Sequence, residues 1–243
     1  MSAAHLAFVV AIIAVAAVIQ AVSGFGFSLA SMPLLAALLG VDKALAIQTT
    51  LGIVSNATTA WRGRPDILRD TATRMLTAMV FGMPFGWLLL EHVSNRNLKL
   101  LVGVVVAVIA VLLALRFTIR STGPAVDYIS GFFSGVLSTS TGTNGPPLVI
   151  GLSGRRLPAA QQRATLSTCF TIANIVVFAA LLWSGRIDRS VAIAVAAAIP
   201  GLLAGSVIGH RIFGRLHQHH YERIVIALLI ASATIAIISA IIG

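Results

Sequence analysis

The stretch STSTGTNGPP, residues 138–147, separates two apolar runs, YISGFFSGVL before it and LVIGLS after it. It carries six hydroxyl or amide side chains and no charge, and its two glycines and two prolines interrupt a regular helix. Irregular backbone at the depth of a bilayer is tolerated only where protein or water surrounds it. If the flanking runs cross a membrane, this segment is therefore expected to line an internal cavity.

The composition indicates that these runs do lie in a membrane. The chain has 243 residues, of which 58% are hydrophobic and 10% charged, and its mean hydropathy is +0.97. A soluble domain has about 25% charged residues, so this chain has too little polar surface to cover itself in water. The apolar runs reach the ~20 residues that a spanning helix needs, and the alternating strands of a barrel are absent. We therefore predict an all-α, multi-pass integral membrane protein.

Charge and cysteine content narrow the alternatives further. The net charge of +10 does not indicate a nucleic-acid partner, because the basic residues lie in short loops rather than in one patch or tail. Such a distribution is typical of residues that set membrane orientation. The first apolar run lacks a preceding basic segment and an early cleavage site, which argues against a removable signal peptide. The single cysteine, Cys169, excludes a disulfide within the chain.

The apolar stretches form a repeating order. They lie at residues 5–40, 44–61, 71–91, 98–117, 126–153, 159–184, 188–210 and 221–242. The first is too long for one span and breaks at SGFGFS, residues 23–28, and the fifth breaks at residues 138–147. Each half of the chain thus begins with an interrupted segment and continues with three plain helices. We divide the chain into residues 1–120 and 121–243, the two halves of one membrane domain.

Short sequence matches support this two-fold internal repeat. The matched positions are Pro33 with Pro147, Pro84 with Pro200, TTL at 49–51 with ATL at 164–166, and GRPD at 63–66 with GRID at 185–188. No single match is specific, but all of them occur in the same order. Paired broken helices at corresponding positions are a known pointer to the binding site of a transporter.

The lysines and arginines predict how the halves are related. If every segment crosses fully, the loops on the two sides of the membrane hold 8 and 9 basic residues, which gives no orientation. If both broken segments enter and return on the same side, the two sides hold 12 and 5, an ordinary positive-inside bias. Each half then crosses three times, so the halves are inverted. Two full crossings of the first segment are the alternative, because its length permits them.

The second break is expected to bind an anion. Asn144 or Gly145 can cap a half-helix at 146–153, with Pro146 at the first position, where a missing N–H does no harm. The N-terminus of this half-helix would direct free N–H groups and partial positive charge at the polar segment. The first break would supply a second helix start. Two such starts, facing each other near the middle of the membrane, would hold a small oxyanion without a costly buried charge.

The candidate site residues come from both breaks and from the helix that follows each of them. Glycines let the backbone approach a ligand, and hydroxyl and amide groups donate hydrogen bonds. The predicted substrate-binding residues are Gly24, Gly26, Ser28, Ser31, Gln48, Thr49, Asn56, Thr139, Ser140, Thr141, Gly142, Thr143, Asn144, Gly145 and Asn174. Arg163 is either a charge that attracts anions or an ordinary interfacial arginine, and the sequence leaves both readings open.

Three motifs carry a resemblance to a known family. They are GFGFSLASMPLL, QTTLGIVSNATTAWRGRPDI and GFFSGVLSTSTGTNGPPLVIGLSGRRLPAAQQRATLST, of which the last is the most specific. With the repeated layout, they resemble the TauE/SafE sulfite-exporter family of bacterial membrane proteins over nearly the whole chain. The resemblance implies secondary export of small sulfur-containing anions, such as sulfite, sulfoacetate or other organosulfonates, across the bacterial inner membrane.

Other functions were weighed against this one. A passive anion channel is the alternative, since it would use the same helix dipoles. An enzyme is not expected, because no H-E-x-x-H motif and no serine with a histidine base at depth is present. No cofactor or metal is expected, and the histidines at 217, 219 and 220 are attributed to a solvated loop. Acidic residues fall at or near span ends, so no proton relay is predicted. The expected partners are a small anionic substrate and the lipid bilayer, and the oligomeric state is left open, a homodimer included.

Overall fold

The computed structural model describes residues 2–24, 26–115, 123–155, 157–213 and 218–242, and this part of the chain contains helices and no strand. Side chains at 22, 23, 113, 210, 212–213 and 218–229 are not described. The helices are α1 (Ala3–Ser23), α2 (Phe27–Leu39), α3 (Val41–Arg62), the short η1 (Arg64–Asp66), α4 (Arg69–His92), α5 (Asn95–Ala114), α6 (Pro124–Ser140), α7 (Gly145–Ser153), α8 (Ala159–Trp183), α9 (Arg189–Phe213) and α10 (Gln218–Ile242).

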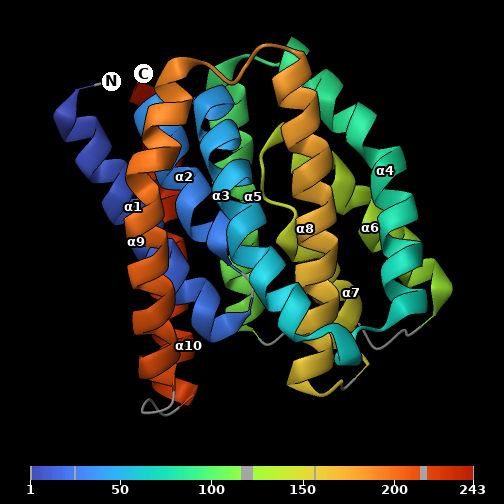
Figure 1. The fold of residues 1–243 in the computed structure, drawn as a ribbon. Coiled ribbons are helices and arrows are strands. Elements are labelled where there is room, and N and C mark those ends of the chain that lie inside the picture. Colours follow the sequence, from blue (N-terminus) through green and yellow to red (C-terminus); the bar gives the residue numbers. More distant parts are fainter. Residues whose placement is uncertain (1, 25, 116–122, 156, 214–217, 243) are drawn as a thin grey trace.

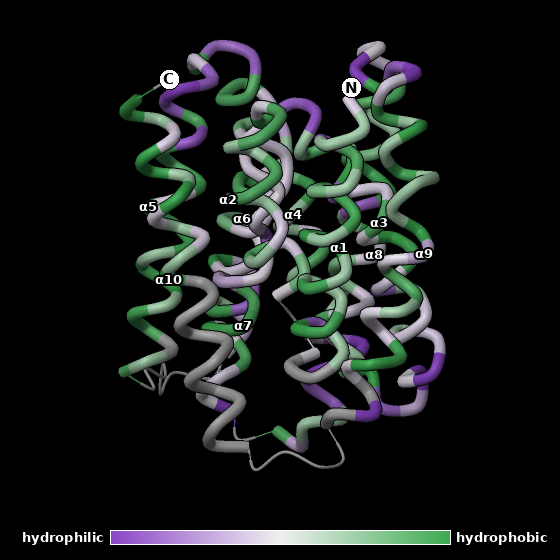
Figure 2. The backbone as a smooth tube through the Cα atoms, turned by 90° about the vertical axis from the view of Figure 1, so that its left-hand side faces the viewer, coloured by the Kyte–Doolittle hydropathy of each residue, from purple (hydrophilic) through white to green (hydrophobic). Residues whose placement is uncertain are grey.

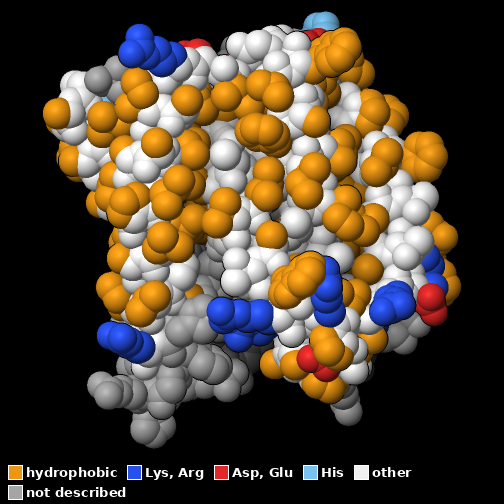
Figure 3. All heavy atoms as spheres, viewed as in Figure 1, with side chains coloured by type: hydrophobic (Ala, Val, Ile, Leu, Met, Phe, Trp, Pro, Cys, Tyr) orange, Lys and Arg blue, Asp and Glu red, His pale blue; other side chains and the backbone are white. Residues whose placement is uncertain are grey.

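The all-helical, membrane-spanning class predicted from composition is confirmed. Among the described residues, five stretches are long and apolar enough to cross a bilayer, in α1, α4, α5, α8 and α9. On the face drawn in Figure 3, apolar side chains lie along the middle of the molecule and the charged groups gather at its two ends. Exposed phenylalanines and isoleucines such as Phe81, Phe133 and Ile175 therefore face lipid rather than water.

The first predicted break lies between α1 and α2. Gly24 (φ 78°) and Gly26 (φ 105°) both have left-handed backbone, which side chains other than glycine rarely adopt. Gly24 closes α1, because its N–H donates to the carbonyl of Gln20 at 2.8 Å. α2 then begins at Phe27 and contains Pro33 as its seventh residue.

The second predicted break lies between α6 and α7. α6 ends at Ser140, Gly142 has a φ of 65°, and α7 begins at Gly145, so the expected half-helix at 146–153 is found one residue longer. Asn144 occupies the position before the helix, but its side chain makes no capping bond. Pro147 is the third residue of α7, so the prolines matched in the sequence do not occupy equivalent places in the two half-helices.

The helices pack in pairs that connect the two halves of the chain. α1 packs along α9, α4 along α6, α3 against α8, and α5 against α10. Figure 1 shows α1, α9 and α10 on one side of the molecule and α4, α6 and α7 on the other, with α3 and α8 between these groups. The short helix α2 contacts α1, α3 and α10.

Polar contacts identify which loops share an end of the molecule. At one end, where both chain termini lie in Figure 1, Asn95 Oδ1 accepts the N–H of Val41 at 3.0 Å, and Arg186 pairs with Asp42. We call this the terminal end. At the opposite end, Arg155 donates to Thr71 Oγ1 at 2.8 Å, so the start of α4 lies beside the loop after α7. We call this the basic end. Hydrophilic residues gather at both ends of the tube in Figure 2, with further polar positions at mid-height.

The two broken segments therefore return to the ends from which they start. α6 begins and α7 finishes at the basic end, where Asp127 of α6 is bonded to Arg155. α1 begins at the terminal end, where Leu6 lines a hollow of about 360 Å³ with Arg189 and Ser190 at the start of α9. α2 finishes at the same end, because Gly40 lies beside Asn95.

Glycines bring two of the helix pairs into backbone contact. A Cβ atom at Gly82 or Gly86 of α4, or at Gly131 or Gly135 of α6, would overlap a backbone carbonyl of the partner helix. Gly201, Gly205 and Gly209 place α9 on the backbone of α1 in the same way. Small residues at four-residue spacing are the usual means by which membrane helices approach closely.

Candidate functional site

The first break is held by Gln20, one turn before the end of α1. Its Oε1 accepts the N–H of Phe27, the first residue of α2, at 3.0 Å, and its Nε2 donates to Asn56 Oδ1 at 2.6 Å. Asn56 in turn donates to the carbonyl of Gly52 at 2.8 Å. The amide of Gln20 thus supplies the N-cap that the sequence around α2 lacks, and it ties the break to α3.

Arg163 of α8 lies against the same break. Its Nη2 donates to the carbonyl of Ala21 at 3.0 Å, close to the C-terminal end of α1, where a cation is favoured. A Cβ atom at Gly24 would lie 2.5 Å from Arg163 Cγ, so the glycine leaves room for the arginine side chain. Arg163 is thus half-buried and contacts the first break, and whether it attracts anions stays a prediction.

The second break lies against α3 and is shut off from solvent. A Cβ atom at Gly142 would lie 2.9 Å from both Gln48 Oε1 and Leu45 Cδ1. Thr141 and Thr143 are fully buried, and Asn144 is 4% exposed. Ser134 of α6 donates to the carbonyl of Asn144 at 2.6 Å, which anchors the start of α7.

Most hydroxyl groups of the predicted site already donate to backbone carbonyls. Thr139 donates to the carbonyl of Met83 at 2.8 Å, and Thr141 donates to that of Leu137 at 3.1 Å. The hydroxyl of Thr143 lies 2.7 Å from that of Thr141. Ser31 and Ser140 bond carbonyls of their own helices in the same way. These hydroxyls keep acceptor lone pairs but offer few hydrogens to an anion in this arrangement.

Two buried polar side-chain atoms, one just before α7 and one on α8, have no partner among the described residues. They are Asn144 Nδ2 and Ser167 Oγ. Gly145 lies beside the ring of Phe170, where an added Cβ would meet only Phe170 Cζ at 3.7 Å. Ser167 is three residues before Phe170 on α8 and therefore shares its face. A buried polar group without a partner is costly, so these atoms mark a place where a ligand or water would bind.

The first turn of α7 offers fewer backbone donors than its position suggests. Pro146 and Pro147 have no N–H, so Gly145 alone donates from the first three residues of the helix. Charge on a bound anion would be met by this N–H, by the dipole of α7 and by the Asn144 amide. The side-chain amide is therefore more important here than the sequence reasoning assumed.

The two breaks contact α3 at two different heights along its axis. Asn56 contacts the first break and Gln48 the second, and these residues are eight positions apart, a rise of ~12 Å. The starts of α2 and α7 therefore lie at different depths rather than opposite each other. Between them, a Cβ at Gly52 would lie 2.6 Å from Asn174 Nδ2, so Asn174 joins α3 and α8 at the centre.

The remaining predicted residues lie close to the breaks as well. Thr49 is buried and donates to Gln48 Oε1 at 3.5 Å, and Ser28 is buried in the first turn of α2. The sequence reasoning did not select Gln20 or Ser167 as site residues. For Ser167 the signal was present in the helical spacing, since Arg163, Ser167, Phe170 and Asn174 recur on one face of α8.

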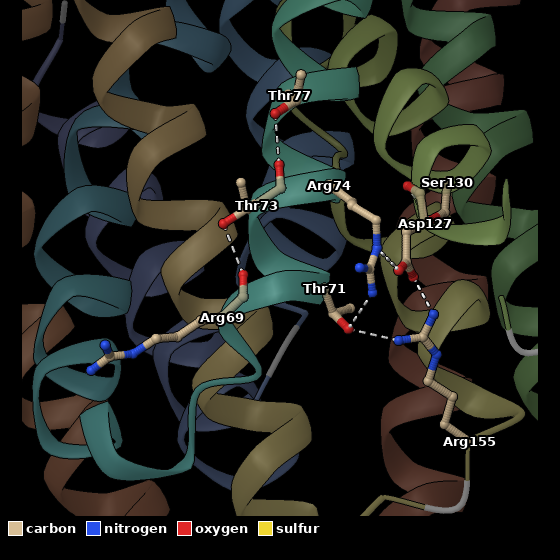
Figure 4. Close-up of polar contacts among 8 residues, drawn as sticks. All are labelled: Arg69, Thr71, Thr73, Arg74, Thr77, Asp127, Ser130 and Arg155. Atoms are coloured by element: carbon tan, nitrogen blue, oxygen red, sulfur yellow. Dashed lines mark hydrogen bonds and ion pairs between the residues drawn. The ribbon is translucent and has the colours of Figure 1, made fainter. Parts of the chain in front are cut away.

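One carboxylate at a span end is buried inside the protein. Asp127 lies near the start of α6, as expected for a residue at a span end, yet its side chain is fully buried. Figure 4 shows it between Arg74 and Arg155, whose guanidinium groups both bond it. The sequence placed Asp127 at a span end, and the structure adds that it is buried there, because position along the chain does not measure burial. Asp127 therefore serves as an ion-pair partner of Arg74 and Arg155 at this end of α6.

The described residues contain no group of three histidine, cysteine or carboxylate side chains close enough to hold a metal ion. The histidines at 217, 219 and 220 lie outside the side chains that the structure describes. Among the described carboxyl groups outside the spans, Asp188 is the one whose pKa is shifted. Hydrogen bonds from the Ser190 hydroxyl and the Val191 N–H lower the pKa of Asp188, which caps α9.

Spanning helices around two buried, uncharged and polar breaks define a membrane transport protein rather than an enzyme. The family model described as Sulfite exporter TauE/SafE matches residues 9–235, and the chain belongs to this family. A similar protein is the "Probable sulfite/organosulfonate exporter TauE" of Cupriavidus necator, 27% identical over 201 residues that cover 79% of this chain and 78% of the relative. No solved structure matches the chain.

Proposed function

We propose that the chain is a secondary exporter of small sulfur-containing anions, such as sulfite, sulfoacetate or other organosulfonates, in the bacterial inner membrane. The observation that carries this proposal is the buried, uncharged second break, where the Asn144 amide has no partner among the described residues. The substrate class is drawn from the family and from the relative named as a sulfite/organosulfonate exporter.

The anion would bind at the start of α7. Asn144 Nδ2 and the N–H of Gly145 would donate to its oxygens, and the hydroxyl of Ser167 would approach from α8. The ring of Phe170 beside Gly145 would contact the carbon substituent of an organosulfonate. Neutral donors hold an anion without the cost of a charge at the bilayer centre, and they release it more readily than a buried arginine would.

We further infer that residues 1–120 and 121–243 form an inverted repeat. If α1 to α5 are exchanged with α6 to α10, the α1–α9 contact becomes the α4–α6 contact, and α3–α8 and α5–α10 are unchanged. The breaks follow the same exchange, since Gly142 lies against Gln48 and Gly24 against Arg163. Gln48 precedes TTL and Arg163 precedes ATL, so the sequence match places both at corresponding positions.

A carrier is favoured over a passive channel by the burial of the second break. Thr141 and Thr143 are 0% exposed, so an anion would reach them only after the surrounding helices move. A carrier requires such a closed state, whereas a conducting channel requires a continuous path. Export of a monoanion from a negative interior is favoured by ~2.3 kcal/mol per 100 mV, which makes the membrane potential a sufficient driving force.

The experiment that tests this proposal uses purified protein in proteoliposomes. We expect uptake of labelled sulfite or sulfoacetate, and we expect unlabelled anion inside the vesicles to accelerate that uptake. Such counterflow is a property of carriers and is absent from channels. Vesicles that remain impermeable to a panel of sulfur-containing anions would contradict the proposed function, and uptake without counterflow would support the channel.

A further inference from the structure

A buried ion cluster fastens the broken segment α6–α7 to α4 at the basic end. Arg74 Nε donates to Asp127 Oδ2 at 2.8 Å, and Arg155 Nη2 donates to Asp127 Oδ1. Arg155 Nη1 also donates to Thr71 Oγ1 at 2.8 Å. Figure 4 shows the four side chains converging, with Arg74 and Thr71 on one side of the carboxylate and Arg155 on the other. We call Asp127, Arg74, Arg155 and Thr71 the foot cluster.

The foot cluster holds both ends of the hairpin formed by α6 and α7. Asp127 is in the first turn of α6, and Arg155 follows the last residue of α7 by two positions. Thr71 and Arg74 belong to the first two turns of α4. α4 is the helix that α6 touches through its glycines, so the cluster extends this contact to the end of α7.

A polar stripe on α6 continues from the foot cluster to the second break. Ser130 lies one turn above Asp127. A Cβ atom added at Gly151 of α7 would be only 2.7 Å from Ser130 Oγ, so the serine lies directly against α7. Ser134, one turn further, donates to the carbonyl of Asn144 at 2.6 Å. α7 is therefore held to α6 at its end by Asp127 and Arg155 and at its start by Ser134 and Asn144. A helix of nine residues is a rigid rod of ~14 Å, so a shift at one end moves the other.

We propose that Asp127 is a positioning residue that, through Arg155 and α7, sets the place of the Asn144 amide at the second break. This inference rests on the proposed function, because it assigns a role to Asn144 in binding. Asp127 does not contact the anion. It keeps Arg155 fixed, and Arg155 keeps the end of α7 against α4. Asp127 is excluded from water, so losing either arginine partner would leave a costly buried charge, and the cluster is held together for that reason.

The alternative is a brace that contributes only stability. Removing Asp127 alone would leave two guanidinium groups facing each other in a buried place, which is destabilising in itself. The double variant Asp127→Asn with Arg155→Gln avoids this problem. It leaves Arg74 as the one charge of the cluster, so the net charge stays at +1, as in the wild type, where two arginines face one carboxylate. Asp70→Asn, an exposed carboxylate beside Thr71, is the matched control.

The test measures the second break directly, without transport. In a Cys169→Ser background, Gly145→Cys reports on the start of α7, and Ser31→Cys reports on the first break. We measure the rate at which each thiol reacts with a methanethiosulfonate reagent in detergent. We expect the double variant to accelerate labelling at position 145 by about tenfold or more and to leave position 31 unchanged, since a lost charged hydrogen bond changes an equilibrium by at least that factor. Asp70→Asn should change neither rate.

Transport adds a second readout. The double variant should raise the KM for sulfoacetate by about tenfold, with a smaller change in the maximal rate per folded protein. The single variant Arg155→Lys keeps Asp127 and a positive charge, so its KM should lie between those of the wild type and the double variant. Unchanged labelling at position 145, or equal acceleration at positions 145 and 31, would overturn the proposal, because the cluster would then be a general brace. If the wild type transports none of these anions, the proposed function fails, and the labelling rates still decide whether Asp127 positions α7.

Discussion

Asn144 differs from the hydroxyl residues around it in what its side chain still offers a ligand. The hydroxyls of Thr139 and Thr141 donate to helix carbonyls, whereas Asn144 Nδ2 is buried without a partner among the described residues. Its backbone carbonyl accepts from Ser134, so the residue is fixed while its amide is available. This combination is typical of a binding group that is oriented before its ligand arrives.

Replacing Asn144 should therefore abolish binding while the protein stays in the membrane. Asn144→Leu keeps the number and branching of the side-chain heavy atoms and removes the amide, and the loss of a hydrogen bond to a charged ligand costs about 1.5–3 kcal/mol, or roughly 10- to 150-fold in affinity. Uptake of labelled sulfite by proteoliposomes measures the effect. Asn97→Leu, at an exposed asparagine of α5, is the control and should transport normally. Normal uptake by Asn144→Leu would remove Asn144 from the site.

A glycine of the second break and a glycine of the loop after α8 allow a matched comparison of backbone strain and crowding. Gly142 (φ 65°) and Gly185 (φ 70°) share the left-handed conformation, but only Gly142 has neighbours, Gln48 and Leu45, in the place of a Cβ atom. Gly185→Ala should cost about 1–2 kcal/mol through strain, and Gly142→Ala should cost that amount plus about 1–3 kcal/mol for displaced side chains. Thermal unfolding in detergent measures both. Equal losses would show that the contact with Gln48 does not matter.

The sequence predicted where the chain is interrupted, but it did not predict which side chains bond to one another across the fold. Both breaks lie where glycine and proline predicted them, because these residues act on their own backbone. The partners of Gln20 and Asp127 lie 36 and 53 residues away in Asn56 and Arg74, and nothing in a single sequence records such distances in space. The donors left free at the second break could not be predicted for the same reason.

Among the helices, backbone contact separates the pairs α4–α6 and α1–α9 from the rest. Glycines at four-residue spacing let these helices touch along their carbonyl groups. The other contacts are made by side chains, which adjust more easily than backbone does. The spans themselves were predicted to within three residues at their ends, but the sequence did not indicate that each broken segment pairs with a helix from the other half.

A methyl group in the α4–α6 contact should force these helices apart. A Cβ at Gly135 would overlap the carbonyl of Met79, whereas one at Gly123, in extended backbone before α6, would meet nothing within 4 Å. Gly135→Ala should therefore lower stability by about 1–3 kcal/mol, and Gly123→Ala by less, because it changes only the residue before α6 and meets no neighbour. Unfolding midpoints in detergent measure the difference. A neutral Gly135→Ala would mean that α4 and α6 are not held at backbone distance.

For the molecule as a whole, the charge distribution and the path of the chain give one orientation. The chain has 17 lysines and arginines, and a path in which both broken segments return assigns 12 of them to one side of the membrane and 5 to the other. On the face of the molecule that Figure 3 draws, most of the blue lysine and arginine side chains lie at the end opposite the chain termini. Cytoplasmic loops carry the excess of basic residues, so the basic end should face the cytoplasm and both termini the outside.

Cysteine labelling of intact cells tests this orientation and the return of α6–α7 at once. In a Cys169→Ser background, we place single cysteines at exposed positions with Asp66→Cys and Pro158→Cys at the basic end and Asn97→Cys at the terminal end. A membrane-impermeant maleimide should label position 97 in intact cells and positions 66 and 158 only after permeabilisation. If α6–α7 instead crossed the bilayer once, position 158 would label together with position 97, because the number of crossings between them would be even. The hydrogen bond from Arg155 to Thr71 requires the first result, since the loops after α3 and after α7 can meet only on one side of the membrane.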